Sequence, residues 1–429
     1  MNNFTRRDFI RLMGAAGAVS TLGWPIVTEA AKARGRVVVV GGGFGGATCA
    51  KYLRRLAPGI KVTLVEPHTK FVTCPFSNAV LGGLYKIDWI THSYDKLRNP
   101  YGVKVIHDTV TRIDPAARKV TLAGGKKLRY DRLVVSPGID FRWGAIKGYD
   151  ETTVEVIPHA WKAGPQTLTL RKQLEQMPNG GTVIIAPPAN PFRCPPGPYE
   201  RASLIAHYLK QVKPRSKILI YDAKDKFSKQ PLFMQGWQKL YPGMIDWIKR
   251  ADGGEIEAVD AVQMTVRPTF GKPQKADVIN LIPPQKAGAI AHAAGLANND
   301  GWCPVNQQTF ESTVHRGIHV IGDAAVASPL PKSGFAASSE AKVCAAAVVA
   351  ALSGEPMPDP SFVNTCYSLV GPHYGISVAM VYRMGEKGNI IKVKGAGGVS
   401  PKNASAMFRR DEARYAVGWY LSISSDTWG

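Results

Sequence analysis

The sequence predicts an α/β protein with two Rossmann-like domains and a small C-terminal interface domain. A strand at residues 36–40 runs directly into a glycine-rich turn, a second such unit opens at residues 182–186, and a late strand is expected at residues 317–321. Strands that alternate with helical stretches are typical of parallel sheets covered by helices. With 429 residues and 45% hydrophobic content, the chain can bury large cores, which agrees with two or three domains.

The first turn has the pattern of a dinucleotide-binding unit. Residues 41–46 read Gly-Gly-Gly-Phe-Gly-Gly, and the acid Glu66 ends the next expected strand. Gly41 allows the tight turn, Gly43 lets the backbone approach a pyrophosphate, and Gly46 lets the helix pack close to the sheet. Glu66 can accept hydrogen bonds from an adenosine ribose. The strand, the helix and the acid agree, so the sequence predicts bound FAD or NAD over a purely structural turn.

The late strand favours FAD over NAD. Gly322 and Asp323 follow residues 317–321, and a helix is expected from about Gly334. This order resembles flavoproteins of the glutathione-reductase type, in which a late Gly-Asp pair reaches the ribityl chain and the next helix points its positive N-terminus at the flavin pyrimidine. The resemblance implies that Asp323 and Gly334 belong to the FAD site.

The first residues predict export. Arg6 and Arg7 precede a mostly apolar run at residues 12–27 and small residues near Ala33, which together indicate a twin-arginine signal over residues 1–33. The apolar run is short for a membrane span and contains Gly and Pro, so an uncleaved anchor is the weaker alternative. We therefore expect a periplasmic mature chain without a transmembrane segment.

The chain is strongly basic, with a formal net charge of +22. Such a charge can serve nucleic acid, anionic lipid, an anionic substrate or an acidic protein partner. Export of a flavoprotein argues against nucleic acid. Because a charge count does not reveal a patch, lysines scattered over the surface are an equal alternative.

The second domain has the strand and acid pattern of a nicotinamide site, but the turn after its first strand differs from that of such a site. A helix at residues 166–177 precedes the strand at 182–186, and a later strand at 217–221 ends at Asp222. The turn at residues 187–191 reads Pro-Pro-Ala-Asn-Pro. Prolines donate no N–H, and without glycine the backbone cannot approach a pyrophosphate. We expect no nicotinamide site, so electrons must come from another donor.

Six cysteines are spread along the chain without a C-x-x-C or C-x-x-C-H pattern, so neither a metal site nor haem attachment is predicted. Cys49 and Cys344 lie in alanine-rich helical stretches and are expected in the core, and Cys303 is also expected to pack. The sequence alone does not choose among disulfide pairings. In an exported protein, a structural disulfide is the default interpretation of such cysteines.

Four segments are distinctive: residues 73–78, 192–201, 331–334 and 364–368. Through them, the chain resembles the flavoprotein subunit of flavocytochrome c sulfide dehydrogenase over nearly all of residues 36–429. The resemblance implies that Cys194 and Cys366 form a redox disulfide beside the flavin. It also implies that Cys74 is bonded to a flavin methyl carbon as a thioether, although Pro75 and Phe76 depart from the family pattern.

The implied reaction is the oxidation of sulfide to sulfur or polysulfide. Hydrosulfide is a small anionic nucleophile that can attack one sulfur of a Cys194–Cys366 disulfide, after which two electrons pass to FAD. Arg193 can aid the thiolate through its charge. Glu200 can accept the sulfide proton, or it can equally be a surface carboxylate paired with Arg201.

The reduced flavin needs an acceptor. Because the chain has no haem motif, the resemblance implies a separate c-type cytochrome subunit as partner. One alternative is a sulfide:quinone oxidoreductase, which should carry an apolar membrane-docking surface; no clear amphipathic basic helix is evident at the C-terminus. A second alternative is an accessory flavoprotein of a sulfur-oxidation complex.

The predicted domains follow from these assignments. Residues 34–148 and 284–355 form the two parts of the FAD-binding domain, and residues 149–283 form the second Rossmann-like domain. Residues 356–429, which contain several aromatic residues, form the C-terminal interface domain.

Overall fold

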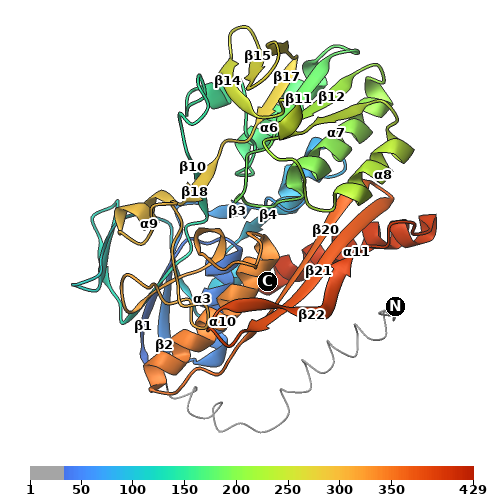
Figure 1. The fold of residues 1–429 in the computed structure, drawn as a ribbon. Helices are drawn as coiled ribbons and strands as arrows, with labels where there is room; N and C mark the ends of the chain where they lie inside the picture. Colours follow the sequence, from blue (N-terminus) through green and yellow to red (C-terminus); the bar gives the residue numbers. More distant parts are fainter. Residues whose placement is uncertain (1–32) are drawn as a thin grey trace.

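The computed structural model describes residues 33–429, which form two α/β domains and a C-terminal sheet with a long helix (Figure 1). Apart from Ala33, the predicted export signal at residues 1–33 lies outside the described residues. The signal therefore stays a prediction.

A five-stranded parallel sheet forms the first domain, with strand order β19-β9-β1-β2-β5. Its strands are β1 (Gly35–Val40), β2 (Ile60–Val65), β5 (Lys104–Ile106), β9 (Arg132–Val135) and β19 (Ile318–Val320). The strands expected at residues 36–40 and 317–321 are confirmed to within a residue at each end. Because β19 lies beside β9, the sheet joins two parts of the chain that are far apart in sequence.

The centre of this sheet is apolar on both faces. The valines of β1 and the Leu-Val-Val run of β9 are all buried, as expected for parallel strands covered on both sides. Helices α3 (Phe44–Leu56) and α10 (Gly334–Ser353) pack against each other beside the sheet. Cys49 and Cys344 meet in this contact and are fully buried, so both are core residues as predicted.

Shorter elements fill the connections of the first domain. They are β3 (Lys70–Val72) with β4 (Thr91–Ser93), the sheet of β6 (Val110–Asp114), β7 (Lys119–Leu122) and β8 (Lys127–Arg129), and helices α4 (Ser77–Leu81), α5 (Asp95–Arg98) and α9 (Ala289–Ala293). Helix α4 starts three residues after Cys74, which brings the distinctive segment 73–78 to a helix start.

The second domain contains a four-stranded parallel sheet with the order β13-β12-β11-β17. Its elements are β11 (Thr182–Ala186), β12 (Lys217–Tyr221), β13 (Ile245–Ile248) and β17 (Val278–Leu281), with helices α6 (Pro165–Gln176), α7 (Gly197–Val212) and α8 (Gln230–Leu240) and the small sheet β14 (Ile256–Asp260), β15 (Thr265–Pro268) and β16 (Gln274–Lys275). The predicted strands at residues 182–186 and 217–221 are confirmed.

The two segments in which the chain passes between the domains pair as antiparallel strands. Strands β10 (Ile139–Phe141) and β18 (Gln285–Ala287) form an antiparallel pair with Asp140 opposite Lys286. In Figure 1 this pair lies between the two domains. The second domain is therefore an insertion held by a two-stranded neck.

The last part of the chain forms a three-stranded antiparallel sheet and one long helix. Strands β20 (Ser361–Gly371), β21 (Tyr374–Met384) and β22 (Ile390–Val399) are followed by α11 (Ala406–Trp428). Strand β20 contacts both α10 of the first domain and α7 of the second. The C-terminal part therefore bridges the two domains and carries Cys366 between them.

Two aromatic residues of α11 are internal, although the segment was expected to form an interface. Tyr420 and Trp428 are buried, and the Trp428 indole donates to the carbonyl of Gly42 at 3.1 Å. The Trp428 ring also stacks on Phe71 with a centroid separation of 5.1 Å. These aromatic side chains join the helix to the glycine-rich turn.

Among residues 33–429, α10 is the one helix whose length and apolar composition would suit a membrane span. Most of this helix is buried between α3 and β20. Its apolar character is therefore that of a core helix.

Candidate functional site

The glycine-rich turn has the close contacts that its sequence predicts. Gly41 has a φ of +94°, and a side chain there would lie 2.3 Å from the carbonyl oxygen of Ser136. A Cβ at Gly46 would lie 1.9 Å from the carbonyl oxygen of Gly41. Only glycine fits these positions, because helix α3 starts directly against the end of β1.

Glu66 is buried at the end of β2 and faces the turn. Its Oε2 accepts the N–H of Gly42 at 2.8 Å, and its Oε1 accepts the N–H of His68 at 3.0 Å. Each carboxylate oxygen has a further lone pair, so the fixed carboxylate can still accept hydrogen bonds from a ribose.

A groove of about 690 Å³ runs from this turn to the N-terminus of α10. Six of the seven predicted cofactor residues line it: Gly41, Gly43, Glu66, Cys74, Asp323 and Gly334. The seventh, Gly46, lies beneath the turn. The buried Oδ1 of Asp323 has no hydrogen-bond partner among the described residues, which leaves an acceptor for a ribityl hydroxyl. The residues present therefore fit FAD.

The N-terminus of α10 can stabilise negative charge on a flavin ring. Ser333 is the N-cap, and its hydroxyl oxygen accepts the N–H of Ala336 at 3.1 Å and donates to Oδ1 of Asn364 at 2.7 Å. Ser333 and Gly334 line the groove. The free N–H groups and the dipole of a 20-residue helix stabilise negative charge at this point.

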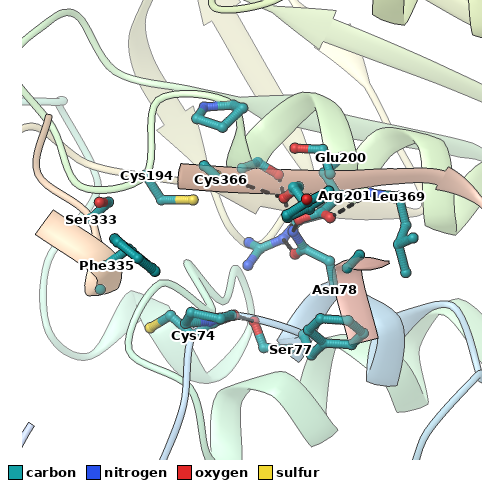
Figure 2. Close-up of a pocket in the computed structure, with 18 of the residues that line it drawn as sticks. Cys74, Ser77, Asn78, Cys194, Glu200, Arg201, Ser333, Phe335, Cys366 and Leu369 are labelled. Carbon is teal, nitrogen blue, oxygen red and sulfur yellow. Dashed lines mark hydrogen bonds between the residues drawn. The ribbon is translucent and has the colours of Figure 1, made fainter. Parts of the chain in front are cut away.

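A second cavity, of about 60 Å³, adjoins the groove and holds the predicted catalytic residues. Cys194, Glu200 and Cys366 all line it, together with Cys74 (Figure 2). Cys194 lies in the loop after β11 with a φ of +60°, and its N–H donates to the carbonyl of Lys332 at 2.8 Å. The small cavity shares Cys74, Arg193, Ser333 and Gly334 with the groove, so sulfur groups and cofactor site are contiguous.

All six cysteines, which lie within the described residues, are thiols in the structure. Burial raises the pKa of Cys194 well above its usual value, and the charges of Cys366, Glu200 and Cys74 raise it further, whereas Lys229 opposes the shift. Burial also raises the pKa of Cys366, again opposed by Lys229. The cavity therefore disfavours thiolates, and Lys229 is the cation that counteracts this effect at both thiols.

Glu200 lines the cavity at the first turn of α7. Its Oε1 accepts the N–H of Leu369 at 2.8 Å, and its Oε2 accepts the side-chain amide of Asn78 at 3.0 Å. Burial raises the pKa of Glu200, although these two hydrogen bonds and the charges of Lys229 and Arg201 act in the opposite direction. A buried carboxyl with a raised pKa is suited to accept and release a proton near the thiols.

The alternative interpretation of Glu200, a surface carboxylate paired with Arg201, does not match the structure. Arg201 is 1% exposed and donates from Nε to Oδ1 of Asn78 at 3.0 Å and from Nη1 to Oδ1 of Asn280 at 2.8 Å. Its remaining hydrogen bonds go to the carbonyls of residues 159 and 160. Asn78 thus stands between Arg201 and Glu200 and orients both.

Arg193 is placed differently from the prediction. Its Nη1 lies 3.4 Å from Sγ of Cys74, and its Nε lies 3.5 Å from Oδ2 of Asp323. The expected support for a thiolate of the Cys194–Cys366 pair is not seen, because the guanidinium contacts Cys74 and Asp323, and Lys229 is the cation that acts on both thiols.

In the second domain, the acid that would bind a nicotinamide cofactor is engaged by side chains of the protein itself. Asp222 is fully buried and accepts hydrogen bonds from the Tyr199 hydroxyl at 2.6 Å, the Trp247 indole at 2.9 Å and Lys224 Nζ at 2.6 Å. Lys224 Nζ also donates to the carbonyl of Pro188 at 2.7 Å. The acid that would bind a ribose is therefore engaged in internal contacts.

Two residues near the thiols were missed by the sequence analysis. Asn78 lies in the distinctive segment 73–78, which marked the region but not the role of the amide. Lys229 is 7% exposed, has a φ of +60°, and donates from Nζ to the hydroxyl of Ser368 at 2.9 Å. Its position depends on packing between α8 and β20, so no local pattern reveals it.

Within residues 33–429, no group of three or more His, Cys, Asp or Glu side chains is arranged to hold a metal ion.

Three family models match the chain. Residues 167–283 match "Sulfide dehydrogenase [flavocytochrome c] flavoprotein chain, central", residues 358–428 match "Flavocytochrome c sulphide dehydrogenase, flavin-binding", and residues 35–174 match "Pyridine nucleotide-disulphide oxidoreductase". The flavin-binding models support FAD as the cofactor, in agreement with the groove.

Two kinds of sulfide-oxidising flavoprotein are among the curated relatives. The chain is 82% identical over 45 residues to the flavocytochrome c sulfide dehydrogenase flavoprotein chain of Chlorobaculum thiosulfatiphilum, a match that covers 10% of this chain and 94% of the relative. It is 32% identical over 175 residues to a sulfide-quinone reductase of Aquifex aeolicus, covering 40% of this chain and only 38% of the relative. A mitochondrial sulfide:quinone oxidoreductase of Mus musculus is 25% identical over 73% of this chain and 70% of its own length.

Solved structures confirm the fold. The sulfide:quinone oxidoreductase of Aquifex aeolicus superposes with a TM-score of 0.69 at 20% identity, covering 92% of each chain. An NAD-dependent persulfide reductase from A. fulgidus superposes with a TM-score of 0.62 at 15% identity, covering 91% of this chain and 77% of that one. The chain therefore has the α/β fold of the pyridine nucleotide-disulfide oxidoreductases, as predicted.

Proposed function

The chain belongs to the sulfide-oxidising flavoprotein family that contains flavocytochrome c sulfide dehydrogenase and sulfide:quinone oxidoreductase, and we propose that it is a periplasmic sulfide dehydrogenase with a c-type cytochrome as acceptor. The observation that carries the proposal is the shared wall of the two cavities. Cys194, Cys366 and Glu200 line a space large enough for a small anion, and this space opens on the groove that fits FAD.

The first step is thiol–disulfide exchange in the small cavity. Hydrosulfide forms a bond to one sulfur of a Cys194–Cys366 disulfide, the S–S bond breaks, and its electron pair stays on the other sulfur. The products are a persulfide on one cysteine and a thiolate on the other. Lys229, which opposes the rise in the pKa of both thiols, stabilises the thiolate that this step creates.

Glu200 takes the proton that hydrosulfide carries. Its carboxylate is held by Leu369 and Asn78 on the cavity side of α7, so it does not need to move to receive a proton. FAD, when bound, accepts the two electrons released as the disulfide re-forms and the oxidised sulfur leaves as sulfur or polysulfide. The proton can then leave through the cavity as Glu200 ionises again.

Covalent attachment through Cys74 is part of the proposal. Cys74 lies in the walls of both cavities, and its Sγ contacts the Arg193 guanidinium and the carbonyl of Trp161 at 3.4 and 3.3 Å. These contacts hold the sulfur at the groove, where a thioether to the flavin would form. A covalent bond would keep the cofactor in a compartment that does not supply free FAD.

The cytochrome acceptor and the periplasmic location rest on the sequence. The expected twin-arginine signal at residues 1–33 indicates export, the chain lacks a haem motif, and two of the three matching models describe flavocytochrome c sulfide dehydrogenase. A haem-bearing subunit supplied by a second chain accounts for all three observations.

The deciding experiment compares acceptors. Sulfide-dependent reduction of a c-type cytochrome and of a soluble quinone is measured with the FAD-loaded mature chain and with Cys194→Ser and Cys366→Ser. Cys303→Ser is the matched control, because Cys303 is buried outside the sulfur cavity. We expect cytochrome reduction that both cavity variants abolish and the control retains. Reduction of quinone alone would refute the acceptor, and full activity in Cys194→Ser would refute the redox disulfide.

A sulfide:quinone oxidoreductase is a second candidate, and one observation favours it. Helix α11 exposes several large apolar side chains among basic ones, with Met407 69% and Leu421 52% exposed. No clear amphipathic basic helix was expected here; the structure shows a 23-residue helix on which exposed apolar side chains are mixed with basic ones. Co-sedimentation with anionic vesicles, weakened in Met407→Ser/Leu421→Ser, would support this candidate.

A further inference from the structure

A second basic cleft lies away from the sulfur cavity, at the junction of the second domain and the C-terminal part. It has a volume of about 550 Å³ and is formed by α7, α8, the turn between β20 and β21, and the start of α11. Six basic residues line it: His207, Lys210, Lys239, His373, Arg409 and Arg410. Among the described residues, no carboxylate lines the cleft, so cations dominate its charged lining.

Two of the cations that line the cleft have side chains without a hydrogen-bond or ion-pair partner among the described residues. Lys239 and Arg410 are exposed and make no hydrogen bond or ion pair with any described residue. Lys210 uses one proton of its Nζ for the carbonyl of Leu240 at 2.8 Å and keeps the others. The nearby Asp411 lies 3.7 Å from Arg414, outside the cleft lining. The charges of Lys239 and Arg410 are therefore not neutralised by a described residue, whereas Arg409 is paired with Glu412.

The wall of the cleft also holds a buried donor without a partner. Arg409 is 2% exposed; its Nη1 contacts Oε2 of Glu412 at 3.2 Å, and its Nη2 donates to the carbonyl of Pro401 at 2.6 Å. Its Nε has no hydrogen-bond partner among the described residues. An unpaired donor that is buried beside a positive cleft points to an anionic ligand, because a buried donor without a hydrogen-bond partner is unfavourable.

The volume and the lining of the cleft indicate which class of ligand it can bind. Its volume lies within the range of about 300 to 1,000 Å³ that is usual for small-molecule sites. Leu240, Tyr241, Pro372 and Tyr374 supply apolar and aromatic surface between the cations. We propose that this cleft binds an organic anion that carries at least two negative charges on a compact apolar body, such as an aromatic polycarboxylate or an organic phosphate.

The site is separate from the sulfur chemistry. Strand β20 passes from Cys366 to Gly371 in five residues, which at about 3.3 Å per residue is roughly 17 Å. The ligand would contact the second domain through α7 and α8, and the C-terminal part through α11, so that binding clamps the two together. Binding does not depend on the proposed oxidation of sulfide and can fail or succeed independently of it.

The test is calorimetric titration of the FAD-loaded chain with benzene-1,3,5-tricarboxylate at constant ionic strength. The cleft variant is Lys239→Ala/Arg410→Ala. The matched control is Lys392→Ala/Lys394→Ala, which removes two exposed positive charges from β22. We expect one saturable site and an affinity about tenfold weaker in the cleft variant, with a change of less than about twofold in the control.

Tm measurements and the comparison with the control variant distinguish specific binding from misfolding and from unspecific attraction between charges. At the same concentration, bound tricarboxylate should raise the Tm of wild type and control clearly more than that of the cleft variant, and the Tm of each free protein reports whether the variant folds. Equal weakening in both variants would mean unspecific attraction to a basic surface and would overturn the proposal. The absence of saturable heat with both the tricarboxylate and an organic diphosphate would overturn it as well.

Discussion

Glu200→Gln is the sharpest test of the sulfur cavity. Glutamine keeps the size of the side chain and an acceptor for the N–H of Leu369, but it cannot take a proton from hydrosulfide. Removal of a positioned general base lowers a rate by about 100-fold to 10,000-fold, equivalent to about 3 to 5 kcal/mol of activation free energy. We expect a fall of that size in kcat/KM for sulfide.

The same substitution should leave the fold intact. The new amide places a donor against the side-chain amide of Asn78, which loses one hydrogen bond at about 1 kcal/mol. This loss is offset because the substitution also removes a buried carboxylate. The Tm should therefore change by only a few degrees, so a large loss of activity would not reflect unfolding.

The pH profile separates a base from a positioning residue. Burial raises the pKa of Glu200 above its usual 4.5, so the acidic limb of kcat/KM should lie above that value, with activity rising as the carboxyl ionises. This limb should disappear in Glu200→Gln and persist in the surface control Glu175→Gln, whose carboxylate pairs with Arg171. A variant with kcat/KM within threefold of wild type, or with an unchanged acidic limb, would refute the reasoning.

Three further predictions concern the same region. In Cys74→Ser, acid denaturation should free the flavin, whereas in wild type the flavin should remain on the Cys74 peptide; release from wild type would remove the thioether. Lys229→Met should slow the alkylation of Cys366 in the reduced protein by about tenfold at pH 8, because the pKa of that thiol rises when its cation is lost, and peptide mass measures the rate. Burial raises the pKa of Glu340 to about 8, so the folded state holds a proton that the unfolded chain releases, and stability should fall as pH rises from about 4.5 to about 8. Denaturant unfolding of Glu340→Gln should show a flatter profile over that window, and an unchanged slope would contradict the assignment.

The parts of the site that sequence could predict are those set by local backbone requirements. The turn at residues 41–46, Glu66 and the late Asp323 belong to strand–turn–helix units whose geometry follows from neighbouring residues. Each lines the groove or supports it where the pattern predicted. The convergence of Cys194 with Cys366 is different, because 172 positions of chain separate them and only the family resemblance brought them together.

The parts that sequence missed depend on packing between distant elements. Lys229 reaches the thiols because α8 packs on β20, and Asn78 is important because, from α4 of the first domain, it hydrogen-bonds both Glu200 and Arg201 of α7 in the second. Helix α11 was not predicted, since its apolar residues face the core, the cavity and the solvent in turn and leave no clear periodicity. Arg193 was misplaced because its guanidinium contacts Cys74 and Asp323, which its position beside Cys194 in the sequence does not reveal.

The second domain explains how a nicotinamide-type fold can serve a different electron donor. Helix α7 follows β11, the position at which such a domain presents a helix N-terminus to a pyrophosphate. In this chain, prolines occupy the turn, Asp222 is engaged by Tyr199 and Lys224, and the same loop and first helical turn carry Cys194 and Glu200. The unit that would bind a phosphate therefore presents a thiol and a proton acceptor to the sulfur cavity. Restoring glycines at residues 187–191 should not restore nicotinamide binding, because the ribose acid would still be engaged by its internal partners.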